Sequence, residues 1–281
     1  FCPMYAGYSP CEKYLKANPK KPLIQCEYGH SMGNSMGGFE HYWNMIRKYP
    51  QFQGGFIWDF VDQGIRQYDD KGNMYYAYGG DFNPYDASDN NFCANGLVSP
   101  DRVPNPQSYE VKYFHQPIWT TQSDIKNGKV NVYNEYFFRN IDAYNMKWNL
   151  VVNGNVVEEG VISNLDVPAQ SAKEYQIPFS SSEFTADDEV FLNVYYTLKK
   201  AEQLLNAGYV IAKSQIPVNT SGFVFEQLAN KASGHPEILA PRIKEPDVNR
   251  VIVEGENFNI EFSKVDGFLC RYDVNGISML E

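Results

Sequence analysis

Apolar residues in the first third of the chain follow a strand, helix, strand pattern. A short apolar run, Pro22-Leu-Ile-Gln-Cys-Glu27, suits a buried parallel strand, and a second run spans residues 55–61. Between them, apolar residues recur at helical spacing at Met36, Phe39, Trp43 and Ile46. Asn34 or Ser35 can cap the start of this helix, and Tyr49-Pro50 marks its end. Two strands joined by a helix predict a βα repeat of a barrel or a doubly wound sheet.

Strand-like alternation replaces the helical pattern near residue 116. Apolar residues at every second position mark three strands: Val130 and Val132; Met146, Trp148, Leu150 and Val152; Val190, Leu192, Val194 and Tyr196. The second of these strands runs into Asn153-Gly154, a dipeptide that favours a hairpin turn. We therefore expect an antiparallel, immunoglobulin-like β-sandwich over residues 117–220.

Polar segments divide these regions. Residues 69–72 form a predicted turn, and residues 80–108 form a long stretch rich in Gly, Asn and Pro, a kind of loop that is usually functional inside a compact domain. Another polar stretch, residues 231–249, is typical of a linker. Phe258, Ile260 and Phe262 then alternate, with turns at residues 266–267 and 275–276, as in the start of a further β domain. The pattern predicts three parts, residues 1–116, 117–220 and 221–281.

Composition and charge narrow the function. The chain has 281 residues, 43% of them hydrophobic, and a formal net charge of -10. We expect no nucleic-acid or membrane partner, because such partners select for clustered Lys and Arg, and a neutral ligand such as a sugar fits better. No apolar run is long enough to span a membrane, and the first residues lack the features of a signal peptide. Since the sequence does not start with Met, we expect the true N-terminus to lie elsewhere. Five scattered cysteines predict free thiols and no zinc site.

A few residues offer chemistry. Glu27 lies at the carboxyl end of a predicted buried strand, where barrel enzymes place their active sites, and either catalysis or a structural role fits it. His30 and Tyr28 follow closely and can donate hydrogen bonds to a carboxylate. Trp58, next to Asp59, suits either the face of a sugar ring or barrel core. The loop from Asp89 to Gly96 offers amide and carbonyl oxygens for sugar hydroxyls or a hard cation.

Five segments of the chain form a distinctive series of motifs: Cys2-Pro-Met-Tyr5, Pro22-Leu-Ile-Gln-Cys-Glu-Tyr-Gly-His-Ser-Met-Gly-Asn34, Gly54-Gly-Phe-Ile-Trp-Asp-Phe-Val-Asp-Gln63, Tyr78-Gly-Gly-Asp-Phe82 and Phe92-Cys-Ala-Asn-Gly-Leu97. The second is followed by Gly37-Gly38-Phe39 and Tyr42-Trp43. In sequence and in order, these motifs closely resemble those of glycoside hydrolase family 2 β-galactosidases. The resemblance is strong over residues 1–115, moderate over the predicted sandwich and weak but continuous beyond it. The implied fold class is multidomain α/β plus all-β, the C-terminal portion of a (β/α)8 TIM barrel followed by an immunoglobulin-like β-sandwich and a further β domain.

The resemblance also implies roles for residues. Glu27 matches the family's catalytic nucleophile, and Tyr5 matches the tyrosine that hydrogen-bonds it. His30 and Trp58 match residues that contact the galactosyl group. The Phe92 carbonyl and Asn95 match ligands of a sodium ion, Na+, beside the sugar, with Asp89 nearby. This sequence departs from the family pattern at three points. The segment between Tyr5 and Glu27 is shorter, and Gly29 and Ser31 replace alanines.

The family's acid/base glutamate and its magnesium ligands belong to earlier barrel strands, and no matching Gly-Asn-Glu segment occurs here. We therefore expect a fragment of a retaining β-galactosidase that is inactive by itself, with the Mg2+ ligands of the full enzyme outside this chain. The expected partners are a galactoside substrate and, for the full-length enzyme, further copies of itself in a homo-oligomer. The expected compartment is the cytoplasm, or the periplasm if a preceding segment carries a signal peptide.

Two rival interpretations remain open. The first is another family 2 glycosidase, a β-glucuronidase or a β-mannosidase. A glucuronidase would need basic residues near C6 of the sugar, and the segment from Phe92 to Asn95 offers none. The second is a non-catalytic carbohydrate-binding or assembly module, although the aromatic residues of the predicted sandwich are ordinary cross-strand core for such a fold.

Overall fold

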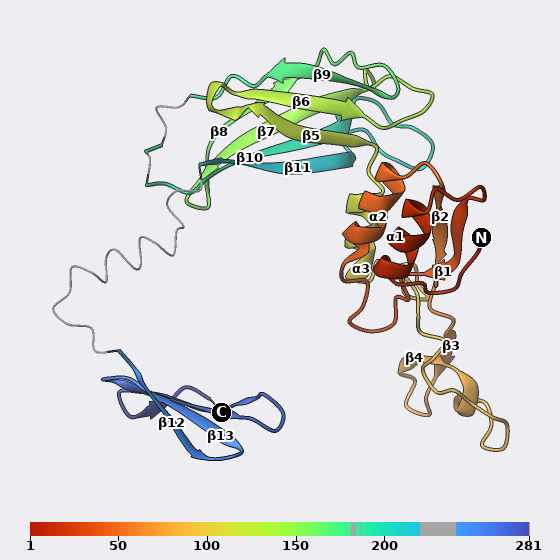
Figure 1. Ribbon diagram of the computed structural model, residues 1–281. Coiled ribbons are helices and arrows are strands. Elements are labelled where there is room, and N and C mark those ends of the chain that lie inside the picture. Colours follow the sequence, from red (N-terminus) through yellow and green to blue (C-terminus); the bar gives the residue numbers. More distant parts are fainter. Residues whose placement is uncertain (181–183, 186, 220–239, 281) are drawn as a thin grey trace. The chain divides into compact units, whose positions relative to one another are not determined.

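The computed structural model describes residues 1–180, 184–185, 187–219 and 240–280 (Figure 1). The chain separates into two compact units, one made of Phe1–Glu183 with Val190–Val218, the other of Phe184–Glu189 with Asn219–Glu281. Strands predominate in both units, and the helices of the described residues all lie before residue 128. Within the described residues, none of the helices has the length and apolar character needed to cross a bilayer.

The start of the first unit contains the predicted strand, helix, strand repeat. Strand β1 (Leu23–Tyr28) pairs in parallel with β2 (Phe52–Ile57), and helix α2 (Phe39–Lys48) connects them. Helix α1 (Tyr8–Lys16) precedes the repeat and contacts α2 (Figure 1). The two helices and two strands close over one apolar cluster formed by Cys11, Leu15, Leu23, Met45 and Phe52. Burial of this cluster is the reason that the helices cover the sheet.

Helix α2 begins later than the sequence predicts. Its first residue is Phe39, and Asn34 and Ser35 do not cap it. Met36 and Gly38 have left-handed backbone, with φ of 67° and 74°, which a right-handed helix cannot include. Gly38 permits this conformation and the close approach of Tyr8, whose hydroxyl donates to the Gly38 carbonyl at 2.9 Å. The helix ends at Lys48, as predicted from Tyr49 and Pro50.

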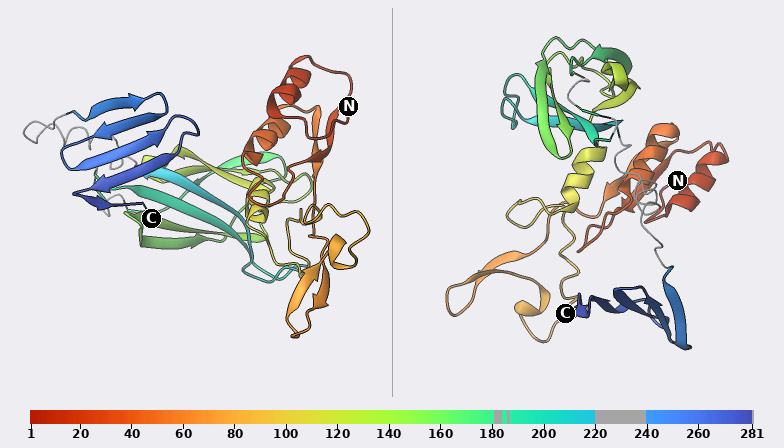
Figure 2. Two further views of the ribbon diagram at one scale, coloured as in Figure 1. Left: turned by 90° about the horizontal axis from the view of Figure 1, so that it is seen from below. Right: turned by 90° about the vertical axis from the view of Figure 1, so that its left-hand side faces the viewer.

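Strand β2 begins and ends earlier than predicted, at Phe52 and Ile57, because the chain then turns to new partners. The Asp59 amide donates to the Asn95 carbonyl at 2.8 Å, and Val61 forms a parallel bridge with Val98. The predicted turn at residues 69–72 joins β3 (Ile65–Tyr68) to β4 (Met74–Ala77), a hairpin that projects from this part of the unit (Figure 2). The long polar segment that follows contains only the short helix η1 (Gly79–Asp81) before helix α3 (Gln107–Phe114).

Two antiparallel sheets form the second part of the first unit. One sheet has the order β5-β6-β9 and the other the order β11-β10-β7-β8. The strands are β5 (Ile118–Asp124), β6 (Lys129–Asn134), β7 (Tyr144–Val152), β8 (Asn155–Ile162), β9 (Ser171–Gln176), β10 (Val190–Leu198) and β11 (Val210–Asn219), with the short helix η2 (Ile125–Asn127) after β5. The predicted hairpin turn joins β7 to β8, and both of its residues, Asn153 and Gly154, have positive φ.

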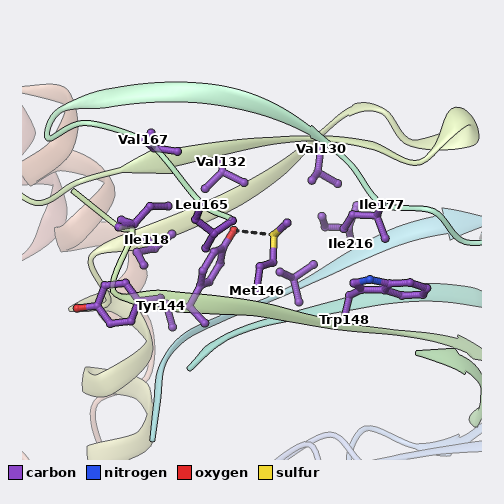
Figure 3. Close-up of a cluster of buried hydrophobic side chains, with 14 of the residues drawn as sticks. Ile118, Val130, Val132, Tyr144, Met146, Trp148, Leu165, Val167, Ile177 and Ile216 are labelled. Carbon is purple, nitrogen blue, oxygen red and sulfur yellow. Dashed lines mark hydrogen bonds between the residues drawn. The ribbon is translucent and has the colours of Figure 1, made fainter. Parts of the chain in front are cut away.

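The two sheets enclose a single core. Figure 3 shows Val130 and Val132 of one sheet facing Met146 and Trp148 of the other. The alternating residues predicted to point inward do so, because Val130, Val132, Met146, Leu192, Val194 and Tyr196 are all fully buried. This core is what fixes the predicted strands into a sandwich.

Residues 240–280 of the second unit form a five-stranded antiparallel sheet. Its strands are β12 (Arg242–Asp247), β13 (Arg250–Glu254), β14 (Phe258–Ser263), β15 (Leu269–Val274) and β16 (Ile277–Ser278). The predicted turns at residues 266–267 and 275–276 connect its last three strands. Part of the predicted linker, residues 231–239, lies outside the described residues, whereas its remainder contains β12 and is therefore not a linker.

Candidate active site

Glu27 lies where β1 meets the first residues of the chain. Met4 forms a parallel bridge with Glu27, and the Tyr5 amide donates to the Glu27 carbonyl at 2.8 Å. The Cys26 amide likewise donates to the Pro3 carbonyl at 3.0 Å. The opening segment therefore runs alongside β1 as a further parallel strand would, and places Tyr5 next to Glu27 at the carboxyl end of the sheet. That end is where barrel enzymes build their active sites.

Tyr5 and Glu27 also interact through their side chains. Burial, the hydrogen bond to Glu27 and the negative charges of Glu27 and Asp59 together raise the pKa of the Tyr5 hydroxyl well above its usual value. Tyr5 has φ of 48°, a conformation that is costly for a residue with a side chain and persists only where the surroundings hold it. A protonated tyrosine beside an ionised carboxylate is a fixed hydrogen-bond donor to that carboxylate.

An aromatic wall continues from Tyr5 across the site. The His30 ring lies 5.7 Å from the Tyr5 ring and 5.6 Å from the Phe92 ring, measured between centroids. His30 follows β1 directly, whereas Phe92 belongs to the long polar loop, so the wall joins segments far apart in the sequence. Phe92 keeps 56% of its surface exposed, which leaves an aromatic face open at the end of this wall beyond His30.

Trp58 is not part of the barrel core of the described chain. Its side chain is 37% exposed, and its backbone carbonyl accepts a hydrogen bond from the Ser31 amide at 2.8 Å. This contact ties the loop after β1 to the loop after β2. Part of the indole is therefore accessible within this chain, as a sugar-binding surface requires.

The Asn95 side chain is the most constrained polar group of the long loop. It is 1% exposed, its Nδ2 donates to the Phe92 carbonyl at 2.6 Å, and its Oδ1 is buried without a hydrogen-bond partner among the described residues. A buried, unpaired amide oxygen is costly unless a donor or a cation fills the site. Oxygen ligands of this kind are the ones that a hard cation such as sodium prefers. The residues present therefore fit the cation that the sequence implies.

The backbone around Asn95 is equally constrained. A Cβ on Gly96 would approach the Asp62 amide nitrogen to 2.1 Å and the Val98 carbonyl to 2.4 Å, so only glycine fits. The Ser31 hydroxyl donates to the Asn95 carbonyl, and the Asp59 amide donates to the same oxygen. Ser31 replaces the alanine of the family pattern, and its hydroxyl fastens the Asn95 loop to the loop that carries His30.

Asp89 contributes through its backbone, whose carbonyl accepts a hydrogen bond from the Phe92 amide at 3.1 Å. Asp59, the carboxylate that follows Trp58, has a less complete set of partners. Its Oδ2 accepts from Gln63 Nε2 at 2.8 Å, while its Oδ1 is buried without a partner among the described residues. Its negative charge acts on Tyr5, so Asp59 belongs to the electrostatic surroundings of Glu27.

Comparison with known families gives two matches within the chain. Residues 3–120 match the TIM barrel domain of glycosyl hydrolases family 2, and residues 130–219 match domain 4 of β-galactosidase. The chain belongs to glycosyl hydrolase family 2. The TIM barrel assignment agrees with the parallel β1–β2 pair and its covering helices. Within the described residues, no group of three or more His, Cys, Asp or Glu side chains is arranged to hold a metal ion.

Curated relatives in family 2 are similar over nearly the whole chain. A β-galactosidase of Photobacterium profundum is 37% identical over 99% of this chain and 28% of its own length. One from Priestia megaterium is 34% identical over 99% of this chain and 26% of its own length. The chain thus spans about a quarter of the length of these relatives. Among solved structures, the β-glucuronidase of Parabacteroides merdae aligns with a TM-score of 0.27 and 13% identity over 95% of this chain and 32% of its own, a similarity too low to carry an argument.

Proposed function

We propose that this chain is part of a retaining β-galactosidase and that Glu27 is its nucleophile. The observation that carries the proposal is the position of Glu27, at the carboxyl end of a parallel strand with the Tyr5 hydroxyl hydrogen-bonded to it. Relatives that span nearly the whole chain are named β-galactosidases, which supports a galactoside as the substrate. The activity belongs to the full-length protein, of which this chain would supply the nucleophile.

In a retaining glycosidase, two carboxyl groups about 5 to 5.5 Å apart flank the glycosidic bond. Glu27 would attack the anomeric carbon and form a glycosyl ester, while the leaving oxygen takes a proton from the second carboxyl group. That group then removes a proton from water, which attacks the same carbon and releases Glu27. The acid/base glutamate would come from another part of the full-length protein.

The other residues would position the sugar. Trp58 offers a partly exposed indole for the apolar face of a pyranose ring, and His30 and Phe92 offer a second aromatic surface. The Phe92 carbonyl and the Asn95 Oδ1 would hold a sodium ion, which when bound supplies a positive charge for a sugar hydroxyl oxygen. Tyr5 would keep the Glu27 carboxylate in one orientation by donating a hydrogen bond to one of its oxygens.

Substitution of Glu27 in the full-length protein tests the proposal. Glu27→Gln keeps the shape of the side chain but cannot form the glycosyl ester, so turnover of o-nitrophenyl galactoside should fall by at least about 10³-fold. Glu40→Gln, which changes an exposed carboxylate on α2, should leave turnover unchanged. Activity of the Glu27 variant within tenfold of the parent would refute Glu27 as the nucleophile.

Covalent labelling and substrate choice give two further readouts. A 2-fluoro-galactosyl inactivator traps the glycosyl ester, so peptide mapping should place the label on Glu27. A label on Asp59 or Asp62 would move the assignment to that residue. Hydrolysis of a glucuronide in preference to the galactoside would exclude the galactosidase proposal while retaining the family.

A further inference from the structure

A second pocket lies away from Glu27, between helix α3 and the outer side of the sandwich. Its volume is about 290 Å³, close to the lower end of the range for small-molecule sites. Helix α3 and the residues after it contribute Tyr109, Lys112, Tyr113 and Gln116 to the lining, whereas β10 and β11 contribute Tyr195 and Lys213 along with aliphatic side chains. None of these residues belongs to the candidate active site.

The four residues from α3 and its extension lie on one face of the helix. Tyr109, Lys112, Tyr113 and Gln116 follow one another at intervals of three and four residues, which places them on the same face of α3 and its extension. Val111 lies on a different face and is buried against the apolar residues around α2. On the tyrosine face, the Tyr113 ring packs edge-on against Trp119 at 5.5 Å, whereas Tyr109 keeps 67% of its surface exposed.

Gln116 fixes the floor of this pocket. It is 3% exposed, and its Oε1 accepts a hydrogen bond from the Lys213 amide at 2.9 Å, which ties the end of α3 to β11. Its Nε2 is buried without an acceptor among the described residues. A buried donor without a partner is uncommon and costly, and an oxygen of a ligand seated at the floor would supply the acceptor.

The charge of the pocket is opposite to that of the protein. The chain carries a net charge of -10, yet the residues that line this pocket include Lys112 and Lys213 and, as far as the described residues extend, no carboxylate. Neither lysine takes part in an ion pair between described residues. The Lys112 Nζ instead lies 4.4 Å above the ring of Tyr209, which keeps it beside the pocket. Two unpaired cations in an acidic protein favour an anionic ligand.

We propose that this pocket is a second ligand site for an acidic sugar, that is, a pyranose ring carrying a carboxylate or a sulfate. The rings of Tyr109, Tyr113 and Tyr195 provide flat apolar faces for the C–H side of the ring, and their hydroxyls provide polar partners at its edge. Lys112 and Lys213 bind the anionic group, and the Gln116 Nε2 donates to a ring hydroxyl. The proposal is independent of the catalytic assignment of Glu27.

Titration of the full chain with D-galacturonate tests the proposal, with binding followed by NMR after a dispersed amide spectrum has established that the chain is folded. Galacturonate should shift signals of α3, β10 and β11, and neutral D-galactose should bind there at least tenfold more weakly because it lacks the anion. The double substitution Lys112→Gln with Lys213→Gln should weaken galacturonate binding by about tenfold, since one exposed ion pair contributes about two- to fivefold to an affinity. Lys173→Gln, which changes an exposed lysine on β9 away from the pocket, is the matched control and should leave galacturonate binding unchanged.

Three results would overturn the proposal. The first is equal binding of galactose and galacturonate at this pocket, which would remove the role of the lysines. The second is galacturonate binding that the paired lysine substitutions leave unchanged, or no binding at all by the folded chain. The third is tighter binding of 4-hydroxybenzoate than of galacturonate, which would assign the pocket to an aromatic acid instead of a sugar.

Discussion

At the scale of single residues, the pair formed by Tyr5 and Glu27 makes a measurable prediction. Burial and the neighbouring carboxylates raise the pKa of Tyr5, so the folded chain favours its protonated form. The stabilisation is fully present below the pKa of an unfolded tyrosine, about 10, and is lost as the pH rises through the higher folded value. Tyr5 should therefore keep donating to Glu27 in moderately alkaline solution.

NMR of chains labelled at the tyrosine Cζ measures this directly, with Tyr5→Phe to assign the signal. Glu27→Gln should lower the pKa of Tyr5, because the amide keeps the shape of the site and removes one negative charge. Glu40→Gln, on the exposed side of α2, should leave the Tyr5 titration unchanged. An unchanged pKa of Tyr5 in the Glu27 variant would mean that the two side chains do not interact.

Asn95 carries a second prediction at this scale. Its buried and unpaired Oδ1 fits a cation, so sodium should tighten galactoside binding to the full-length protein. Replacing sodium by a bulky organic cation at equal ionic strength should raise KM several-fold, and Asn95→Ala should abolish that difference. Asn91→Ala, in the same loop, should retain it. Equal KM values in the two salts would remove the sodium assignment.

The site residues differ in how far the sequence reveals them. Tyr5, Glu27, His30, Phe92 and Asn95 belong to motifs, and the structure brings them into one neighbourhood. The hydrogen bonds that hold this neighbourhood together were not predictable, because Ser31 and Asn95 are 64 residues apart and only the fold makes them neighbours. The action of the Asp59 charge on Tyr5 was not predictable for the same reason, since it depends on their proximity in the fold.

At the scale of secondary-structure elements, the local sequence pattern predicts whether a helix or strand forms better than it predicts where that element begins and ends. The core strands β6, β7 and β10 agree with the predicted alternation because burial on one face needs only a period of two. Helix α2 was predicted, but its start depends on Tyr8 and a left-handed Gly38. Helix α3 was not predicted, because only Val111 among its residues is buried and its apolar pattern is weak.

One arginine joins helix α2 to the sandwich. The Nε and Nη2 atoms of Arg47 donate to the two carboxylate oxygens of Glu135 at 2.7 and 2.9 Å, and Nη2 also donates to the Phe114 carbonyl at 2.7 Å. The guanidinium lies 4.4 Å from the ring of Trp119, whose Nε1 donates to the same glutamate at 2.9 Å. The geometry is bidentate and stacked, which a lysine cannot reproduce.

Arg47→Lys should therefore lower the free energy of unfolding by about 1–3 kcal/mol, since it leaves partly buried acceptors unpaired. Lys129→Gln breaks the exposed ion pair with Glu174 and should cost less than about 1 kcal/mol. Urea denaturation of the two variants gives the comparison. If both substitutions lower the free energy of unfolding by the same small amount, the contact of Arg47 with Glu135 does not couple helix α2 to the sandwich.

At the scale of the whole molecule, the cores differ in size. The sandwich core contains 16 buried residues that all lie between Ile118 and Ile216. The two clusters around α1, α2, β1 and β2 contain five buried residues each. The long polar loop and the β3–β4 hairpin add exposed apolar side chains such as Ile65, Tyr68 and Tyr85 to this part of the chain. Local opening should therefore require less free energy in the first third of the chain than in the sandwich.

Limited proteolysis of the 281-residue chain tests this difference, because cleavage under mild conditions follows local opening. Among residues 1–180, the first cuts should fall between residues 65 and 106, where most side chains are exposed, and the last fragment to survive should lie within about residues 117–220. Mass spectrometry of the fragments over time identifies both. Arg47→Lys should hasten loss of the first third without shortening the life of the sandwich fragment, because its core does not include Arg47. A sandwich that is cut as early as the polar loop would mean that its core is not stable by itself.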